Sequence, residues 1–240
     1  MKRILIIGAT SGIGLETTRC YIQKGWRVGI AGRRINALQE LQNQFPDQVA
    51  YEAFDITSPD AAEHLNSLIQ KTGGMDIFLL SSGIGSQNKE LNPEIELNTV
   101  RTNVEGFTRM VTVAFDFFKR QGFGHIAVIS SIAGTKGIGV APSYSATKRF
   151  QNNYIQALAQ LAHLKKLNIQ FTDIRPGFVE TDLLKDRAYP LLMKADQVAV
   201  KITQAIERKK RIVVIDYKYK ILVFFWKLIP GWIWERLSIK

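Results

Sequence analysis

Residues 2–14 of the chain read KRILIIGATSGIG, a sequence that predicts a strand, a turn and the start of a helix. The apolar run 2–7 is typical of a buried strand, and the segment from the glycines to about residue 24 has the pattern of a helix. Glycines at such a turn let the backbone approach a pyrophosphate, and the first N–H groups of the helix point toward the same anion. A tight turn without a ligand would also contain glycines, so the position directly between strand and helix is what favours a phosphate site. The candidate contacts in this turn are Gly8, Thr10, Ser11, Gly12, Ile13 and Gly14.

The rest of the chain alternates short apolar runs with amphipathic segments. We predict an α/β fold, a Rossmann-type doubly wound parallel sheet, because strands and helices alternate at the spacing of right-handed βαβ units. Residues 1–215 form one domain in this interpretation, followed by a hydrophobic tail, 216–240. Ser58 is expected to cap the third helix, with Pro59 at its first position. The predicted strands after the first are 26–31, 49–54, 76–80, 125–130, 168–174 and 211–215, and the predicted helices after the first are 35–45, 58–70, 92–119, 143–164 and 195–207.

Composition and charge exclude several classes of protein. The 240 residues include one cysteine, Cys20, which cannot form an internal disulfide and favours a reducing compartment. The N-terminal apolar run is too short for a secretory signal, so a cytoplasmic protein is expected. Three scattered histidines offer no metal-ligand spacing, and no metal is expected. The net charge is +11, and residues 185–240 hold thirteen Lys and Arg against five Asp and Glu. No nucleic-acid motif accompanies this excess, so no nucleic acid is expected as partner; an anionic lipid surface or an acidic substrate remains open.

The end of the second predicted strand indicates which dinucleotide the turn would accept. NAD has a ribose 2′-hydroxyl that calls for an acidic acceptor here, whereas the 2′-phosphate of NADP calls for a guanidinium. The chain has Arg33 and Arg34 and no acid, which favours NADP(H) over NAD(H). Two solvated arginines at a helix start are the alternative. Asp55, after the third strand, is a candidate acceptor for the adenine amino group, or simply a turn residue.

The clearest candidates for catalytic residues are Ser131, Tyr144 and Lys148. Tyr144 and Lys148 are four apart at the start of a predicted helix, so their side chains share a face. A phenol has a pKa near 10, and using it as an acid/base near neutral pH requires stabilising its anion by about 4 kcal/mol. A lysine ammonium one turn away can supply much of this stabilisation. By itself, the pair is also common on helix surfaces.

Residues 1–210 resemble the short-chain dehydrogenase/reductase family. The resemblance rests on several motifs in the family's order and spacing: Gly8, Gly12, Gly14, Asp55, Asn103, Ser131, Tyr144, Lys148, the run Arg175-Pro176-Gly177, and Thr181. Two positions depart from the family pattern. Ile7 stands where a Thr usually precedes the first glycine, and Leu80-Ser81-Ser82-Gly83 replaces Asn-Asn-Ala-Gly.

The resemblance implies a role for each member of the catalytic set. Tyr144 would be the general acid/base, and Lys148 would lower its pKa and hold the nicotinamide ribose. Ser131 would orient and polarise the substrate carbonyl. Asn103 would anchor a water that links Lys148 to a proton relay; otherwise it is an Asn in a long helix. Further cofactor contacts implied by the family are Ile56, Ser82, Gly83, Pro176, Gly177, Val179 and Thr181, together with Tyr144 and Lys148.

Two segments near the C-terminus point to the substrate and to partners. Residues 178–195 have the position of a substrate lid, and their apolar side chains suggest a hydrophobic carbonyl compound, or packing on the sheet. Lys185, Arg187 and Lys194 leave room for an anionic head group. The tail is aromatic and basic, too short to span a membrane and interrupted by Lys227 and Pro230. It could contact a membrane surface through 217–240, close the substrate pocket, pack in a subunit interface, or belong to the core.

These observations predict an NADP(H)-dependent carbonyl reductase or alcohol dehydrogenase acting on a small-molecule carbonyl or alcohol substrate that is hydrophobic or long-chain. The family resemblance also implies a homodimer or homotetramer. The alternatives are a nucleotide-binding sensor without turnover and a peripheral membrane protein whose tail is its function.

Overall fold

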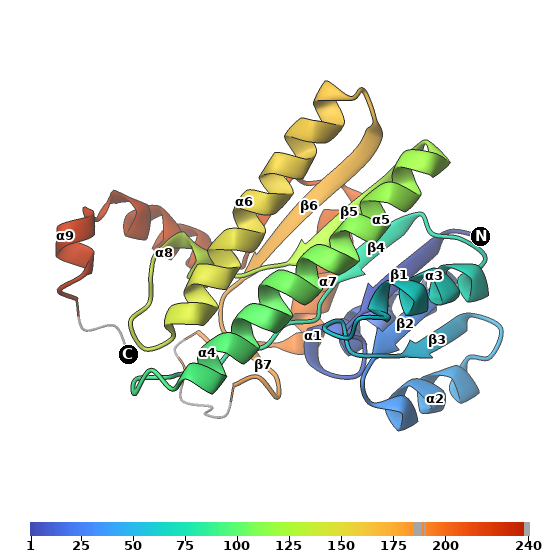
Figure 1. The fold of residues 1–240 in the computed structure, drawn as a ribbon, viewed down its shortest axis with the longest axis horizontal. Coiled ribbons are helices and arrows are strands. Elements are labelled where there is room, and N and C mark those ends of the chain that lie inside the picture. Colours follow the sequence, from blue (N-terminus) through green and yellow to red (C-terminus); the bar gives the residue numbers. More distant parts are fainter. Residues whose placement is uncertain (185–188, 190, 238–240) are drawn as a thin grey trace.

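Seven parallel strands form the central sheet in the computed structural model, which describes residues 1–184, 189 and 191–237 (Figure 1). Their order is β3-β2-β1-β4-β5-β6-β9. The chain therefore runs outward from β1 in one direction and then restarts at β4 on its other side, which confirms the predicted doubly wound sheet. A separate two-stranded pair is formed by β7 (Val179–Glu180) and β8 (Met193–Lys194). The sheet strands are β1 (Arg3–Ile7), β2 (Arg27–Gly32), β3 (Val49–Ala53), β4 (Ile77–Leu80), β5 (Phe123–Ile129), β6 (Asn168–Pro176) and β9 (Ile212–Ile215).

Helices cover both faces of the sheet, because successive strand residues point to opposite sides. In β1, Leu5 and Ile7 pack with α3 (Ala61–Thr72), α5 (Phe107–Gln121) and α6 (Pro142–Leu164). Ile4 and Ile6 pack with the other layer, which consists of α1 (Gly12–Gln23), α2 (Ile35–Gln44) and α7 (Ala195–Glu207). The strands are thus buried on both faces.

Two helices differ from the prediction. The third helix begins at Ala61 instead of Ser58, because the Ser58 hydroxyl donates to the Asp55 carbonyl at 2.7 Å and closes a turn there instead of capping the helix. The long helix predicted at 92–119 consists of α4 (Pro93–Val100), a π-helical turn η1 (Arg101–Gly106) and α5. Such turns interrupt helices frequently at functional sites.

The tail folds into α8 (Tyr217–Leu228) and α9 (Gly231–Trp234), which extend away from the sheet (Figure 1). Tyr219, Val223 and Trp234 are nevertheless buried. Among the described residues, no helix has the length and apolar character needed to cross a membrane.

A buried carboxylate joins three of these elements. Asp173 on β6 is 1% exposed and accepts a hydrogen bond at 2.5 Å from the hydroxyl of Ser130, which follows β5. Asn152 on α6 donates its Nδ2 to Asp173 at 3.1 Å, and Arg175 donates Nε and a terminal nitrogen at 2.8 and 2.6 Å. The ends of β5 and β6 and the middle of α6 are therefore held together by one charged group.

We predict that Asp173→Ala lowers the free energy of unfolding by about 3–5 kcal/mol, because the largely buried Arg175 loses its counter-ion. Urea unfolding followed by circular dichroism measures this change. Asp116→Ala, which breaks an exposed pair with Arg120 on α5, is the matched control and should change stability by less than about 0.5 kcal/mol. Equal losses in the two variants would contradict the role assigned to Asp173.

Candidate active site

The predicted site residues gather at the edge of the sheet where the carboxyl ends of the strands lie, because all the strands are parallel and end on the same side. Ser131 follows β5 and begins the short 3-10 turn η2 (Ile132–Thr135), where its hydroxyl accepts the Ala133 N–H at 3.1 Å. Tyr144 and Lys148 occupy the first two turns of α6, which starts with Pro142 at its first helical position. The structure thus brings together three residues that lie on two separate elements.

Tyr144 is half-buried between Ser131 and Lys148. Burial raises the pKa of its phenol above the ordinary value, and hydrogen bonding by the Ser131 side chain offsets part of this increase. The Lys148 Nζ lies 5.7 Å from the centre of the Tyr144 ring. In this arrangement, desolvation has the largest effect on the pKa of the Tyr144 phenol.

Lys148 is buried at 4% exposure, and burial lowers its pKa to about 8, although the charge of Asp173 acts in the opposite direction. Its Nζ donates to the Ile129 carbonyl at 3.2 Å and to the Gln151 Oε1 at 3.1 Å. These two oxygens hold the ammonium beside Tyr144. The lowering of the Tyr144 pKa by Lys148 that the resemblance implies stays a prediction.

Asn103 lies in the π-helical turn and is completely buried. Its side chain donates to the Ile84 carbonyl at 2.7 Å and accepts the Ile84 N–H at 2.9 Å, so it fixes the loop after β4. Its own carbonyl accepts the Gln151 Nε2 at 2.9 Å. The Gln151 amide therefore connects Lys148 to the backbone of Asn103.

Gln151 is the residue that sequence reasoning missed. It is 1% exposed and lies three positions after Lys148 on the same helix. A polar residue at that spacing from a predicted catalytic lysine was the available signal, but its second partner, the Asn103 carbonyl, lies on another element and could not be predicted from spacing.

The glycine turn has the shape expected of a phosphate site. Gly8 has a φ of +93°, and a Cβ at Gly14 would lie 2.0 Å from the Gly8 carbonyl oxygen, so both positions require glycine. Ser11 precedes α1 without a capping bond from its side chain, and the first turn of α1 contains no acid. The N–H groups at this helix end are therefore available to an anion.

Arg33 and Arg34 lie beside this turn. The Arg34 guanidinium donates to the Thr10 hydroxyl with two nitrogens, each at 3.2 Å, and lies 3.5 Å from Asp182. Arg33 is 72% exposed and lies 3.6 Å from Asp55. Partial burial raises the pKa of Asp55, but hydrogen bonds from Thr57 and the Arg33 charge outweigh it and leave the pKa below its ordinary value. Two guanidinium groups thus border the glycine turn.

The remaining predicted cofactor residues lie at four places in the structure. Ser82 donates its N–H to the Ile7 carbonyl at 2.9 Å, and Thr181 packs against Gly12, so both line the glycine turn. Gly83 lies next to Asn103 and Lys148. Pro176 ends β6, Gly177 follows it, and Val179 begins β7. The side chain of Ile56 is buried in the core, as is that of Val179, and the Ile56 carbonyl accepts a hydrogen bond from Arg109 at 2.9 Å.

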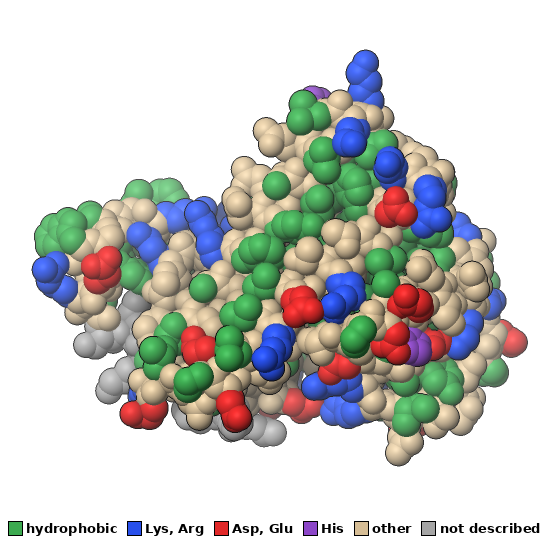
Figure 2. Space-filling model, viewed as in Figure 1, with side chains coloured by type: hydrophobic (Ala, Val, Ile, Leu, Met, Phe, Trp, Pro, Cys, Tyr) green, Lys and Arg blue, Asp and Glu red, His purple; other side chains and the backbone are tan. Residues whose placement is uncertain are grey.

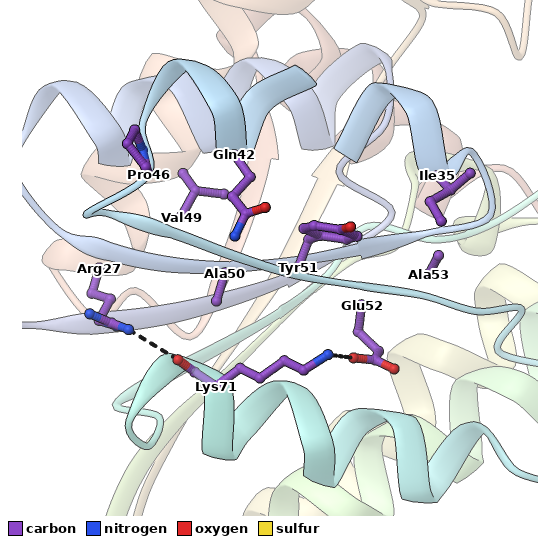
Figure 3. Close-up of a pocket in the computed structure, with 10 residues that line it drawn as sticks. All are labelled: Arg27, Ile35, Gln42, Pro46, Val49, Ala50, Tyr51, Glu52, Ala53 and Lys71. Atoms are coloured by element: carbon purple, nitrogen blue, oxygen red, sulfur yellow. Dashed lines mark hydrogen bonds and ion pairs between the residues drawn. The ribbon is translucent and has the colours of Figure 1, made fainter. Parts of the chain in front are cut away.

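Phe178 and Tyr189 stack with ring centres 4.5 Å apart in the predicted lid, whereas Lys185 and Arg187 lie outside the described residues. A separate open groove of about 590 Å³ runs along the edge strand β3 (Figure 3). It contains the Lys71–Glu52 ion pair and a hydrogen bond from Arg27 to the Lys71 carbonyl (Figure 3). None of the predicted site residues lines this groove.

Comparison with known proteins agrees with this geometry. The model of the short chain dehydrogenase family matches residues 2–190. An uncharacterized oxidoreductase of Mycobacterium tuberculosis is 29% identical over 218 residues, covering 87% of this chain and 85% of the relative. Dehydrogenase/reductase SDR family member 7B of Bos taurus is 26% identical over 254 residues, covering 95% and 78%. The solved closed form of serine dehydrogenase complexed with NADP+ has a TM-score of 0.77 and 25% identity, and the match covers 85% of this chain and 88% of that one.

The chain belongs to the short-chain dehydrogenase/reductase family, and it is an NAD(P)-dependent oxidoreductase. The family resemblance seen in the sequence is therefore confirmed.

We predict that turnover falls as the pH rises through about 8, where the buried Lys148 loses its proton. Gln151→Glu should move this midpoint to higher pH, because a carboxylate beside Nζ stabilises the ammonium. Gln151→Leu should move it to lower pH, because Nζ loses an acceptor. The measurement is the pH profile of kcat/KM, with Gln160→Glu on the exposed side of α6 as control. A midpoint that is the same in all four proteins would contradict the role of Gln151 in holding the Lys148 ammonium.

Proposed function

We propose that the protein is an NADP(H)-dependent oxidoreductase that transfers a hydride between the nicotinamide and a carbonyl compound or secondary alcohol. The observation that carries this proposal is the meeting of Ser131, Tyr144 and Lys148 at the sheet edge that also bears the glycine turn.

The residues present at this edge fit a dinucleotide that carries a 2′-phosphate. The absence of a Cβ at Gly14 lets the start of α1 pack against the Gly8 carbonyl, and the first N–H groups of α1 would bind the pyrophosphate. The exposed guanidinium of Arg33 would bind the 2′-phosphate, with Arg34 adding charge and Asp55 accepting from the adenine. Thr181 and the backbone after Pro176 would flank the nicotinamide, and Lys148 its ribose. The bound cofactor supplies or accepts the hydride.

The residues of the chain would manage the proton and the position of the carbonyl. The Tyr144 hydroxyl donates its proton to the carbonyl oxygen in reduction and takes it back in oxidation. The Ser131 hydroxyl holds the same oxygen. The Lys148 ammonium lies close enough to favour the tyrosinate while it remains protonated, and the Asn103–Gln151 pair holds it in place. Burial of Lys148 keeps water from screening this charge.

A hydrophobic substrate is supported by the side chains of the lid. Phe178 and Tyr189 form its aromatic pair, and Met193 packs both on the sheet core and on the cluster around Tyr219. A cationic residue at the end of the lid, Lys194, would suit an anionic head group on the same substrate.

The proposal also covers assembly and location. Self-association as a homodimer or homotetramer follows from the family resemblance, and contact with a membrane surface follows from the composition of residues 217–240.

Tyr144→Phe should lower kcat/KM by about 10²- to 10⁴-fold, because it removes the proton donor and leaves the ring in place. The measurement is NADPH oxidation with the best ketone found, alongside fluorescence titration of NADPH binding, which should be nearly unchanged. Tyr154→Phe on the same helix is the matched control and should retain activity. Near-normal turnover by the Tyr144 variant would refute the mechanism.

Arg33→Ala should raise the KM for NADPH by roughly 10- to 100-fold, the loss expected for a hydrogen-bonded charge pair. The KM for NADH should stay the same, since NADH has no 2′-phosphate. Arg120→Ala, an exposed arginine on α5, serves as control. If the unaltered protein prefers NADH, the NADP(H) assignment is wrong.

A further inference from the structure

Helix α8 has two apolar faces, and among the described residues only one of these faces packs against the rest of the protein. On the inner face, Tyr219 and Val223 are 1% and 5% exposed and pack with Ile132 of η2. On the outer face, apolar side chains remain largely in solvent. A short surface helix normally has a single apolar stripe, so the second one calls for a partner.

The inner face is anchored firmly beside the site. The Tyr219 ring covers Gly177, where a Cβ would lie 2.3 Å from the ring. Its hydroxyl accepts the Phe178 N–H at 3.1 Å and donates to the Leu191 carbonyl at 3.1 Å. Tyr219 therefore connects α8 to the first residue of the predicted lid and to Leu191 in its second half.

The short helix α9 is anchored as well. Trp234 donates its Nε1 to the Gly137 carbonyl at 2.6 Å and packs edge-on against Trp226 at 5.2 Å. Lys136 donates to the Ile229 carbonyl at 2.8 Å. Because these contacts fix α8 and α9 to the loop before α6, the outer face has a defined orientation.

The outer face is a continuous apolar stripe with a basic rim. Tyr217, Ile221, Phe224 and Leu228 recur at helical spacing, so they lie on one side of α8, and their exposed fractions are 66%, 53%, 60% and 63%. Phe225 lies next to them at 58%, and Trp232 of α9 is 65% exposed. Figure 2 shows hydrophobic side chains gathered on this lobe with Lys and Arg side chains beside them. At 100° per residue, Lys218 lies on one side of the stripe, and Lys220 and Lys227 lie on the other.

We propose that this outer face docks on an anionic lipid surface, with Phe224, Phe225 and Trp232 in the interface and the lysines at the head groups. Exposed aromatic and aliphatic side chains rimmed by cations are the composition of an interfacial helix. An acidic lipid surface complements the lysines, whereas a second copy of α8 in a two-fold dimer would set the same lysines against each other. Lipid is therefore favoured over self-association as the occupant of this face.

Docking in this way brings the lid to about one helix diameter, ~10 Å, from the lipid, since Tyr219 on the inner face holds Phe178 and Leu191. This deepens, and rests on, the proposed function: a hydrophobic carbonyl compound would reach the site from the lipid phase. The docking itself requires no turnover.

The test is co-sedimentation of the full chain with vesicles of phosphatidylcholine alone or of phosphatidylcholine and phosphatidylglycerol. The unaltered protein should bind the anionic vesicles at least about tenfold more tightly, since each basic residue near such a surface contributes attraction. Phe224→Ser/Phe225→Ser and Lys220→Glu/Lys227→Glu should each weaken this binding about tenfold or more. Leu164→Ser/Lys165→Glu, at an exposed apolar and basic site at the end of α6, is the matched control and should bind normally.

Two further readouts separate the outcomes. NADPH binding and turnover of a water-soluble ketone should be unchanged in the tail variants, so loss of vesicle binding is distinguished from failure of the proposed reaction. Equal binding to both vesicle types, or equal binding by all variants, would overturn the proposal. So would light scattering that shows a dimer converted to a monomer by Phe224→Ser/Phe225→Ser, because the face would then belong to a second copy.

Discussion

The arrangement of the site depends on the buried carboxylate of Asp173. Ser130, Asn152 and Arg175 all donate to it, and these residues adjoin Ser131, Lys148 and Pro176 respectively or share an element with them. A charge with 1% exposure is stable only when hydrogen bonds surround it, so the carboxylate forces the ends of β5 and β6 toward α6. The same charge opposes the effect of burial on Lys148. One interaction therefore links the register of the sheet to the protonation of the site.

Local patterns in the sequence predict the sheet, which the structure confirms, and they also select the main members of the candidate site. The glycine turn, the four-residue spacing of Tyr144 and Lys148, and Arg33 after β2 each combine residue type with position in an element. What the sequence could not reveal depends on contacts between distant segments. Gln151 gains its meaning only from Asn103 on another helix, and Ser58 donates to Asp55 instead of capping a helix. The effect of Lys148 on Tyr144 likewise depends on burial, which no spacing rule measures.

For the tail, composition alone did not decide between several roles. Its composition alone was compatible with a pocket wall, a subunit interface and a membrane contact. The structure divides these properties between two sides of one helix: Tyr219 and Val223 face the protein, whereas Phe224 and Leu228 face outward. The basic excess of the C-terminal region contributes to the rim of the outer side through Lys218, Lys220 and Lys227. Helix α8 thus carries the apolar and basic outer face on one side and, on the other side, contacts the loop that would cover the substrate.

The central claim is that the edge formed by Ser131, Tyr144 and Lys148 carries out hydride and proton transfer on a carbonyl group. Its most direct test uses NADPH that carries deuterium in place of both hydrogens at the nicotinamide C4, a panel of ketones graded by chain length and head-group charge, and mass spectrometry of the products. The account predicts alcohols with one deuterium on the carbinol carbon, formed best from the more hydrophobic ketones. Tight NADPH binding without deuterium in any product would contradict it and would indicate a nucleotide-binding protein without turnover.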